Sequence, residues 1–323
     1  MEVTLPNYSY VFNFEQEFAH YETRRWMREN WTYGFYYVGV YMILIFGGQH
    51  YMQSRPKYNL RGVLSLWNTL LAGFSIMGAC RTAPELLHTL KNYGLYHSDK
   101  VSGFWSWMFV LSKLPELGDT IFIVLRKQPL IFLHWYHHIT VLLYSWFSYT
   151  EYTSSARWFI VMNYCVHSVM YSYYALKSMG YRPYKSIQMI ITTLQLIQMV
   201  VGCFINLWAY NFINSVPSSS SMESSGPYFC HISKLNIKLS VAMYFSYFVL
   251  FSRFFYKNYI NKDYNVKEHH SNGYEQQQQQ QTNKIKTSNK SVTRGGGVGV
   301  GGTPAGNAIS SNAIENNYKA KYH

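Results

Sequence analysis

Apolar stretches of about 20 residues, each bounded by polar residues, recur along the chain as far as residue 260. A helix of about 20 apolar residues is long enough to cross the roughly 30 Å hydrocarbon core of a bilayer. Such a helix also satisfies its own backbone hydrogen bonds, as a segment surrounded by lipid must. We therefore predict seven transmembrane helices: Tyr33–Met52, Val63–Thr82, Gly103–Leu125, Ile131–Tyr149, Ala156–Leu176, Ile187–Tyr210 and Leu235–Tyr256.

The composition divides the 323-residue chain into an apolar body and a polar tail. Charged residues make up 13% of the chain, about half the usual share. After about Lys262 the residues are mostly Gln, Asn, Lys, Ser and Gly, which cannot bury enough apolar surface to fold. We predict an all-α polytopic membrane protein with a lumenal segment at 1–32, a seven-helix domain enclosing a substrate tunnel at 33–260, and a disordered cytosolic tail at 261–323.

The distribution of lysine and arginine predicts the orientation of the chain. The loops after the first, third and fifth helices are basic and hold no acidic residue, whereas the loops on the other side carry both charges. By the positive-inside rule the basic loops are cytosolic, so the N-terminus is lumenal and the C-terminus cytosolic. The glycosylation sequon at Asn7 and the dilysine spacing of Lys319 and Lys321 agree with an endoplasmic reticulum protein in this orientation.

Charged residues interrupt the third predicted helix, and charge inside a bilayer usually marks function. Lys113, Glu116 and Asp119 are spaced i, i+3 and i+6, which keeps them near one helical face, where they can neutralise one another. One interpretation is a catalytic role, and the other is a structural ion-pair cluster beside a kink at Pro115. The spacing leaves both open.

Three histidines share one face of the fourth predicted helix. His134, His137 and His138 stand at i, i+3 and i+4, so their imidazoles project from the same side. A lone histidine in such a helix is usually a core residue, but three titratable rings on one face are hard to explain by packing. We predict that they are catalytic.

Polar stripes continue on the next two helices. Their members recur at helical intervals: Asn163, His167, Met170, Tyr171 and Tyr174 in the fifth helix, and Thr192, Gln195 and Gln198 in the sixth. Core packing, or hydrogen bonding between helices, would also explain these stripes. Because lipid cannot satisfy polar groups, four consecutive helices with such faces predict a polar chamber inside the bundle.

Four segments carry these residues in a fixed order: Lys113-Leu-Pro-Glu116-Leu-Gly-Asp119-Thr120, His134-Trp-Tyr-His137-His138, His167-Ser-Val-Met170-Tyr171-Ser-Tyr173-Tyr174 and Thr192-Thr-Leu-Gln195-Leu-Ile-Gln198. They resemble the signature motifs of the very-long-chain fatty acid elongase (ELO) family, and the resemblance covers roughly residues 7–260. It implies a 3-oxoacyl-CoA synthase of the endoplasmic reticulum. Such an enzyme condenses an acyl-CoA with malonyl-CoA and releases carbon dioxide and CoA, as the first step of the elongation cycle.

Within that family the chain resembles the members that act on saturated and monounsaturated substrates of about palmitoyl length. The similarity lies in segments 45–49 and 130–133, and Pro129 stands where polyunsaturated-type members usually have glutamine. One feature departs from the family pattern, because the loop at 97–103 is short and has no cysteine to pair with Cys230. Cys230 is then free, or pairs with Cys80, or the chain derives from a variant transcript.

The resemblance suggests roles for the histidines. His137, the second histidine of its motif, is the expected nucleophile, and it would carry the acyl group as an acyl-histidine intermediate. His134, His138 and His167 are expected to serve in proton transfer and oxyanion stabilisation.

The other polar residues of the chamber have expected roles around these rings. Asp119 or Glu116 would fix a histidine tautomer, as the acid does in a serine-protease triad. Asn163 and Gln195 would donate hydrogen bonds to an enolate. Lys113 belongs to the same catalytic group.

Substrate binding is expected at two places. Side chains of the chamber would line the path of the acyl group: Thr192, Gln195, Gln198, Tyr171 and Tyr174. Basic side chains at the cytosolic end would hold the CoA phosphates: Arg126, Lys127, Lys177, Arg182, Lys185, Arg253 and Lys257. The acyl chain would run toward the lumen, where a closed tunnel can rank chain lengths because each buried methylene contributes about 0.8 kcal/mol.

Two other classes of protein share some of these features. A membrane di-iron desaturase or hydroxylase also carries HxxHH, but it needs more histidines than the four in these stripes, so no metal and no cofactor are expected. A non-catalytic lipid carrier would not need charged residues and four histidines in one chamber. The expected partners are acyl-CoA, malonyl-CoA, membrane lipid and other enzymes of the cycle, with a homodimer left open and no nucleic acid.

Overall fold

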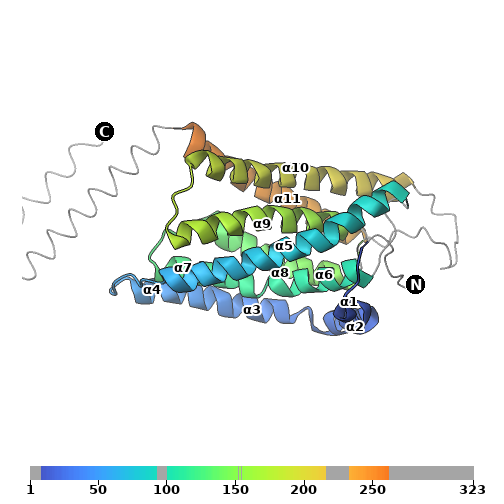
Figure 1. Ribbon diagram of the computed structural model, residues 1–323, viewed down its shortest axis with the longest axis horizontal. Coiled ribbons are helices and arrows are strands. Elements are labelled where there is room, and N and C mark those ends of the chain that lie inside the picture. The colour runs from blue at the N-terminus through green and yellow to red at the C-terminus, as the bar shows by residue number, and fades with distance from the viewer. Residues whose placement is uncertain (1–8, 93–99, 152, 154, 216–232, 262–323) are drawn as a thin grey trace, which may run out of the picture. The chain divides into compact units, whose positions relative to one another are not determined.

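Helices make up nearly all of the chain that the computed structural model describes, and no strand occurs among these residues (Figure 1). The described residues are 9–92, 100–151, 153, 155–215 and 233–261. By its contacts the chain divides into two units, 1–262 and 263–323, and the described residues belong to the first. The predictions about Asn7, Cys230, Lys319, Lys321 and nearly all of the tail lie outside the described residues.

The helices follow one another as α1 (Asn13–Gln16), α2 (His20–Asn30), α3 (Tyr33–Met42), η1 (Ile43–Gly47), α4 (Gly48–Met52), α5 (Arg61–Asn92), α6 (Lys100–Ser112), η3 (Pro115–Leu117), α7 (Gly118–Leu125), α8 (Phe132–Glu151), α9 (Ala156–Met179), α10 (Lys185–Ser215), α11 (Lys234–Phe255) and η4 (Tyr256–Ile260). Here η1 and η4 are π-helical turns and η3 is a 3₁₀ turn. Every predicted transmembrane segment is mostly helical, which confirms the all-α fold class. Helices α1 and α2 had not been predicted.

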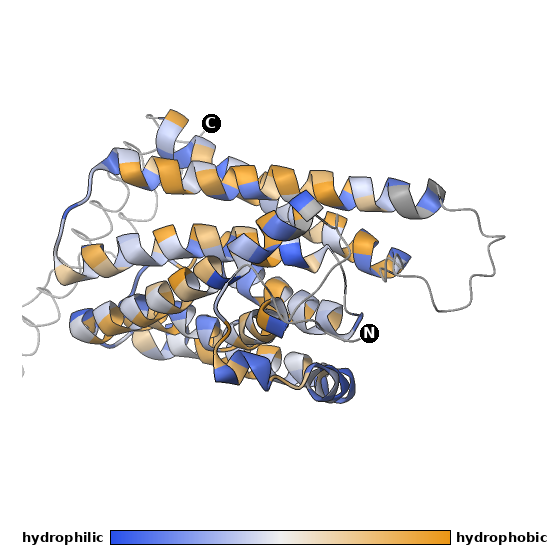
Figure 2. Ribbon diagram, turned by 45° about the vertical axis from the view of Figure 1, so that its right-hand side comes forward, coloured by the Kyte–Doolittle hydropathy of each residue, from blue (hydrophilic) through white to orange (hydrophobic). Residues whose placement is uncertain are grey.

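Three helical segments of the described chain are long and apolar enough to cross a membrane, by length and composition: Arg61–His88, Lys185–Asn211 and Lys234–Ile260. In Figure 2 many residues of α10, the helix labelled at the top of Figure 1, have the colour of hydrophobic residues. The chain is therefore a multi-spanning helical membrane protein. The other predicted spans are broken into shorter helices or carry polar stripes, so the number of seven stays a prediction.

The third predicted span is a broken helix. Proline has no N–H to donate, and its ring would clash with the carbonyl four residues earlier, so an α-helix cannot continue unchanged through Pro115. The chain instead tightens, with the Leu114 N–H donating to Leu111 O (3.2 Å), and passes through η3 before α7 begins. Lys113 and Glu116 lie at this break and are almost fully buried. A charged pair therefore occupies the middle of the span.

Two contacts of a tyrosine ring with a glycine bring helices close together. A Cβ atom at Gly78 in α5 would overlap the ring of Tyr164 in α9, and one at Gly202 in α10 would overlap the ring of Tyr244 in α11. The Tyr164 hydroxyl also donates to Trp105 O in α6 (2.9 Å). Glycine at these two positions is therefore what allows α5 to pack on α9 and α10 on α11.

One buried carboxylate holds α1 against the bundle. Glu15 is fully enclosed and accepts hydrogen bonds from Arg81 Nε (2.9 Å) and Nη2 (2.7 Å), Trp105 Nε1 (2.8 Å) and the Phe12 N–H (3.0 Å). Burial opposes ionisation of Glu15, but the donors outweigh it and hold its pKa below the ordinary value of 4.5. The chain before α2 is thus fixed to α5 and α6.

We expect Glu15→Gln to lower the free energy of unfolding by about 2 kcal/mol at neutral pH, because it breaks a charge-assisted hydrogen-bond network. A depressed folded-state pKa contributes stability that is complete above the unfolded pKa and is lost as pH falls through the folded pKa. The melting temperatures of wild type and variant should therefore differ by a constant amount down to about pH 4.5 and converge below it. The control is Glu29→Gln in the exposed Arg25–Glu29 pair, which should not alter melting. Equal shifts in both variants would contradict this account.

Candidate active site

A cavity of about 520 Å³ lies among α5, α7, α8, α9, α10 and α11, a volume in the range of small-molecule sites. Most of the predicted site residues line it: His134, His137, His138, His167, Asp119, Asn163, Gln195, Gln198, Tyr171, Tyr174, Thr192, Arg126 and Lys177. Some polar lining residues had not been predicted to be site residues: Arg61, Asn68, Gln128, Ser178 and Gln188. Four helices that carried polar stripes in the sequence therefore do share one chamber.

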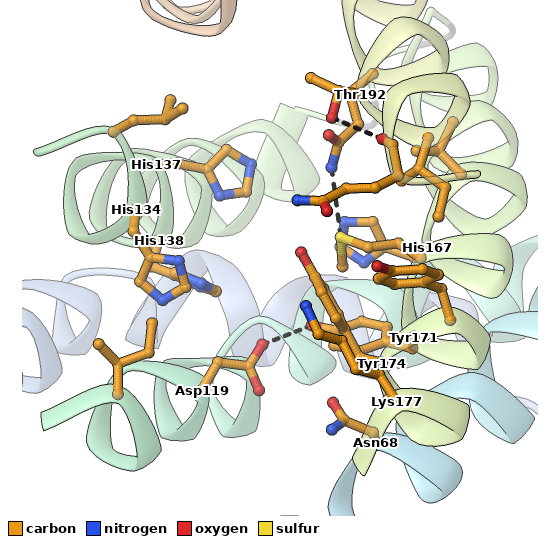
Figure 3. A pocket seen from close by; sticks show the side chains of 18 of the residues that line it. Asn68, Asp119, His134, His137, His138, His167, Tyr171, Tyr174, Lys177 and Thr192 are labelled. Carbon is orange, nitrogen blue, oxygen red and sulfur yellow. Dashed lines mark hydrogen bonds between the residues drawn. The ribbon is translucent and has the colours of Figure 1, made fainter. Parts of the chain in front are cut away.

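The histidines of α8 form one wall of this cavity, opposite His167 and Thr192 (Figure 3). The rings of His134 and His138 have centroids 4.6 Å apart, and His134 Nε2 and His138 Nδ1 are enclosed without a hydrogen-bond partner among the described residues. His137 packs against the Tyr247 ring, with centroids 4.9 Å apart. No hydrogen bond joins its ring nitrogens to another residue of the described chain. A lone pair on His137 is therefore available to a molecule in the cavity.

A series of buried, hydrogen-bonded side chains supports His167. Asn163 Nδ2 lies 3.2 Å from His167 Nε2, and Lys113 Nζ donates both to Asn163 Oδ1 (3.3 Å) and to Glu116 Oε1 (2.6 Å). Ser112 Oγ also donates to Glu116 Oε1 (2.9 Å). Lys113 and Glu116 themselves do not line the cavity. The charged pair at the break in the third predicted span is thus connected to the cavity through the carboxamide of Asn163.

Asp119 occupies a position that differs from the predicted one. It accepts hydrogen bonds from Trp67 Nε1 (2.6 Å) and from the Tyr171 hydroxyl (2.8 Å), the second of which is drawn in Figure 3. Neither Asp119 nor Glu116 has a hydrogen bond to a histidine within the described residues. Among the described residues no hydrogen bond supports the prediction that one of these carboxylates fixes a histidine tautomer, and the side chain beside His167 Nε2 is that of Asn163. Trp67 had been missed because an indole in an apolar span gives no sequence signal of its partner.

The basic rim of the cavity is smaller than predicted. Arg126 and Lys177 line the cavity, whereas the other predicted phosphate ligands do not: Lys127, Arg182, Lys185, Arg253 and Lys257. Lys127 Nζ instead donates to Gln53 O (3.2 Å) and to Arg55 O (3.1 Å). It therefore binds the free carbonyls after the end of α4, a common use of lysine at a helix C-terminus.

Arg61 completes the rim from α5. Its Nε donates to Ser178 O (2.9 Å) at the end of α9, and its side chain lines the cavity beside Lys177. The sequence had shown Arg61 only as one of the charges that predict orientation, because its contact with α9 joins residues 117 positions apart.

The face of α10 supplies uncharged polar groups to the cavity. Thr192 Oγ1 lies 3.3 Å from the Tyr259 hydroxyl of η4, and Gln195 Nε2 lies 3.4 Å from Met170 Sδ. Gln198 is almost fully buried. Among the described residues no group of three or more His, Cys, Asp or Glu side chains is arranged to hold a metal ion. Cys80, Cys165 and Cys203 form no disulfide with one another in the described part of the chain.

The fold and the cavity define a multi-spanning helical membrane protein with an internal site built around four histidines. The family model described as "ELO: GNS1/SUR4 family" matches residues 26–267. The chain is 68% identical over 264 residues to a protein of Drosophila melanogaster named very long chain fatty acid elongase 6, covering 79% of this chain and 81% of that one. It is 46% identical over 259 residues to the human protein of the same name (78% and 93% covered), and 39% identical over 264 residues to human very long chain fatty acid elongase 3 (79% and 92%). The chain belongs to the ELO family.

Proposed function

We propose that this protein is a fatty acid elongase, an acyltransferase that condenses a long-chain acyl-CoA with malonyl-CoA to give 3-oxoacyl-CoA, carbon dioxide and CoA. The observation that carries the proposal is the ring of His137, which lines the cavity and whose nitrogens have no hydrogen bond to another described residue. The identity of 68% to a relative named very long chain fatty acid elongase 6 supports it.

The reaction is proposed to proceed in two halves. In the first, an imidazole nitrogen of His137 bonds to the thioester carbonyl carbon, the C–S bond breaks, and CoA leaves as a thiol with the proton lost by the other ring nitrogen. In the second, malonyl-CoA loses carbon dioxide and keeps the electron pair as an enolate. The enolate carbon bonds to the acyl carbon, the C–N bond breaks, and the imidazole takes up a proton from water. This route needs neither a metal nor a cofactor.

A reaction in two separate halves needs only one binding place for CoA. In the part of the chain that the structure describes, the basic side chains on the cavity are Arg61, Arg126 and Lys177, and we assign them to one binding place for CoA phosphates. If the first CoA leaves before malonyl-CoA binds, one such place suffices. An enclosed cavity also limits hydrolysis of an acyl-imidazole between the two halves.

The test of the proposed function is to supply membranes containing the full chain with labelled malonyl-CoA and a panel of saturated and monounsaturated acyl-CoAs. Labelled 3-oxoacyl-CoA should form from substrates of about palmitoyl length. Since the rim binds phosphates through charge, the KM for acyl-CoA should rise with ionic strength. A protein that forms no labelled product from any member of the panel is not an elongase.

The proposed location is the endoplasmic reticulum membrane, with the N-terminus lumenal and the tail cytosolic. The basic loops of the sequence that contain Arg61, Arg126 and Lys177 support this orientation by the positive-inside rule. These three residues also line the cavity. The proposal requires that the sequon at Asn7 be glycosylated and the last residue be exposed to the cytosol. A tag at His323 that is protected after selective permeabilisation of the plasma membrane would overturn it.

A further inference from the structure

The ammonium of Lys113 determines which atoms donate and which accept in the hydrogen bonds that connect Lys113, Asn163 and His167. This group sits over the ring of Phe109, 4.1 Å from its centroid, and pairs with Glu116. An ammonium can donate but cannot accept. The atom of Asn163 that faces Lys113 must therefore be the carboxamide oxygen, and the amide nitrogen must face His167.

The direction of the hydrogen bond between Asn163 and His167 follows from the position of the Asn163 amide nitrogen. The Asn163 amide nitrogen can only donate, so His167 Nε2, 3.2 Å away, accepts through its lone pair. A neutral imidazole has one lone pair and one N–H, which leaves the proton of His167 on Nδ1. Nδ1 has no hydrogen-bond partner in the described part of the chain, and the ring lines the cavity. His167 therefore offers an N–H, and no lone pair, to a bound molecule.

The N–H that His167 offers complements the lone pair of His137 on the opposite wall of the cavity. Figure 3 shows the ring of His137 from α8 and that of His167 from α9 on opposite sides of the cavity. Acyl transfer needs a lone pair to attack the carbonyl carbon and a donor to stabilise the charge that develops on its oxygen. Two histidines of opposite polarity across one cavity can supply both.

We propose that Lys113 and Asn163 are positioning residues that hold His167 as its Nδ1–H tautomer, which makes His167 the hydrogen-bond donor to the acyl oxyanion. This inference rests on the proposed elongase function for the identity of the oxyanion. The charged residues around Pro115 then have both of the roles considered from the sequence. The Lys113–Glu116 ion pair is structural, and it also acts on the catalytic site through Asn163.

The tautomer can be measured without turnover. In purified full-length protein labelled with ¹⁵N-histidine, the signals that disappear in His167→Gln belong to His167. We expect a protonated Nδ1 and an unprotonated Nε2 near neutral pH. Proton on Nε2, or on both nitrogens, would overturn the proposal.

Asn163→Leu tests the positioning role, since leucine has the same branched arrangement of four side-chain heavy atoms as asparagine and removes the donor to Nε2. The pure Nδ1–H pattern should be replaced by a mixture of tautomers, and kcat should fall by about 100-fold, with KM changed much less. The matched control is Asn68→Leu, a second buried asparagine on the cavity whose loss should leave the His167 signals as in wild type. Unchanged His167 signals in Asn163→Leu would also overturn the proposal.

The two proposals fail in different ways. If wild-type protein elongates acyl-CoA but His167 carries its proton on Nε2, the positioning proposal is wrong and the elongase function stands. If His167 is the Nδ1–H tautomer but no acyl-CoA is elongated, the elongase function is wrong and the role of Lys113 and Asn163 in fixing the ring stands.

Discussion

Replacing His137 by alanine should reduce condensation on the order of 10⁴-fold or more, because loss of a covalent nucleophile removes the reaction path itself. Wild-type protein given acyl-CoA without malonyl-CoA should release up to one equivalent of CoA and gain the mass of the acyl group on a peptide that contains His137. His137→Ala should do neither. Mass spectrometry of the trapped peptide and a thiol assay make the two measurements.

The fold of His137→Ala should be unaffected. Thr140 and Tyr247 donate to the backbone carbonyl of His137, which alanine retains. The matched control is His50→Ala, because His50 is an exposed histidine of α4 that does not line the cavity, and its variant should keep full activity. If wild-type protein releases CoA only when both substrates are present and no adduct forms, a ternary complex with histidines as acid and base replaces the two-step route.

Replacing Lys113 by methionine should be the most destabilising single change in the cavity region. Lys113 and Glu116 are 2% and 3% exposed, and removing one partner of such a pair leaves an uncompensated buried charge, at a cost of about 3–5 kcal/mol. The second variant is Lys113→Met with Glu116→Leu, which removes both charges and should recover most of the lost stability. Thermal unfolding in detergent measures both.

Turnover should not recover with stability in that double variant. Asn163 would still lack the donor that orients its carboxamide, so kcat should stay well below that of wild type. If the double variant regains both stability and full turnover, the ion pair has only a structural role. If neither recovers, the two residues do not act as a pair.

The apolar pattern predicted the helices well because the apolar residues that allow a helix to lie in lipid all belong to one continuous segment of sequence. The segment 33–52 is helical from end to end, as α3, η1 and α4, and α8 begins within one residue of the expected Ile131. Helix α2 escaped prediction because it is mostly polar, and only its contacts with the bundle explain it. His134, His137 and His138 could be placed on one face because helical spacing is a local property.

Contacts between distant segments could not be read in the same way. Trp67 and Asp119 are 52 residues apart, and Lys113 and Asn163 are 50 residues apart. A list of polar residues cannot show which carboxylate or amide reaches which ring. The same limit explains why Lys127 looked like a phosphate ligand, although it binds carbonyls after α4.

The contacts between Tyr164 and Gly78 and between Tyr244 and Gly202 constrain how the chain can vary over generations. A side chain at either glycine needs the space that a ring already fills, so a first substitution there is harmful until the tyrosine opposite also changes. We therefore expect each glycine to change only together with its tyrosine, and the two pairs to vary independently because they join different helices.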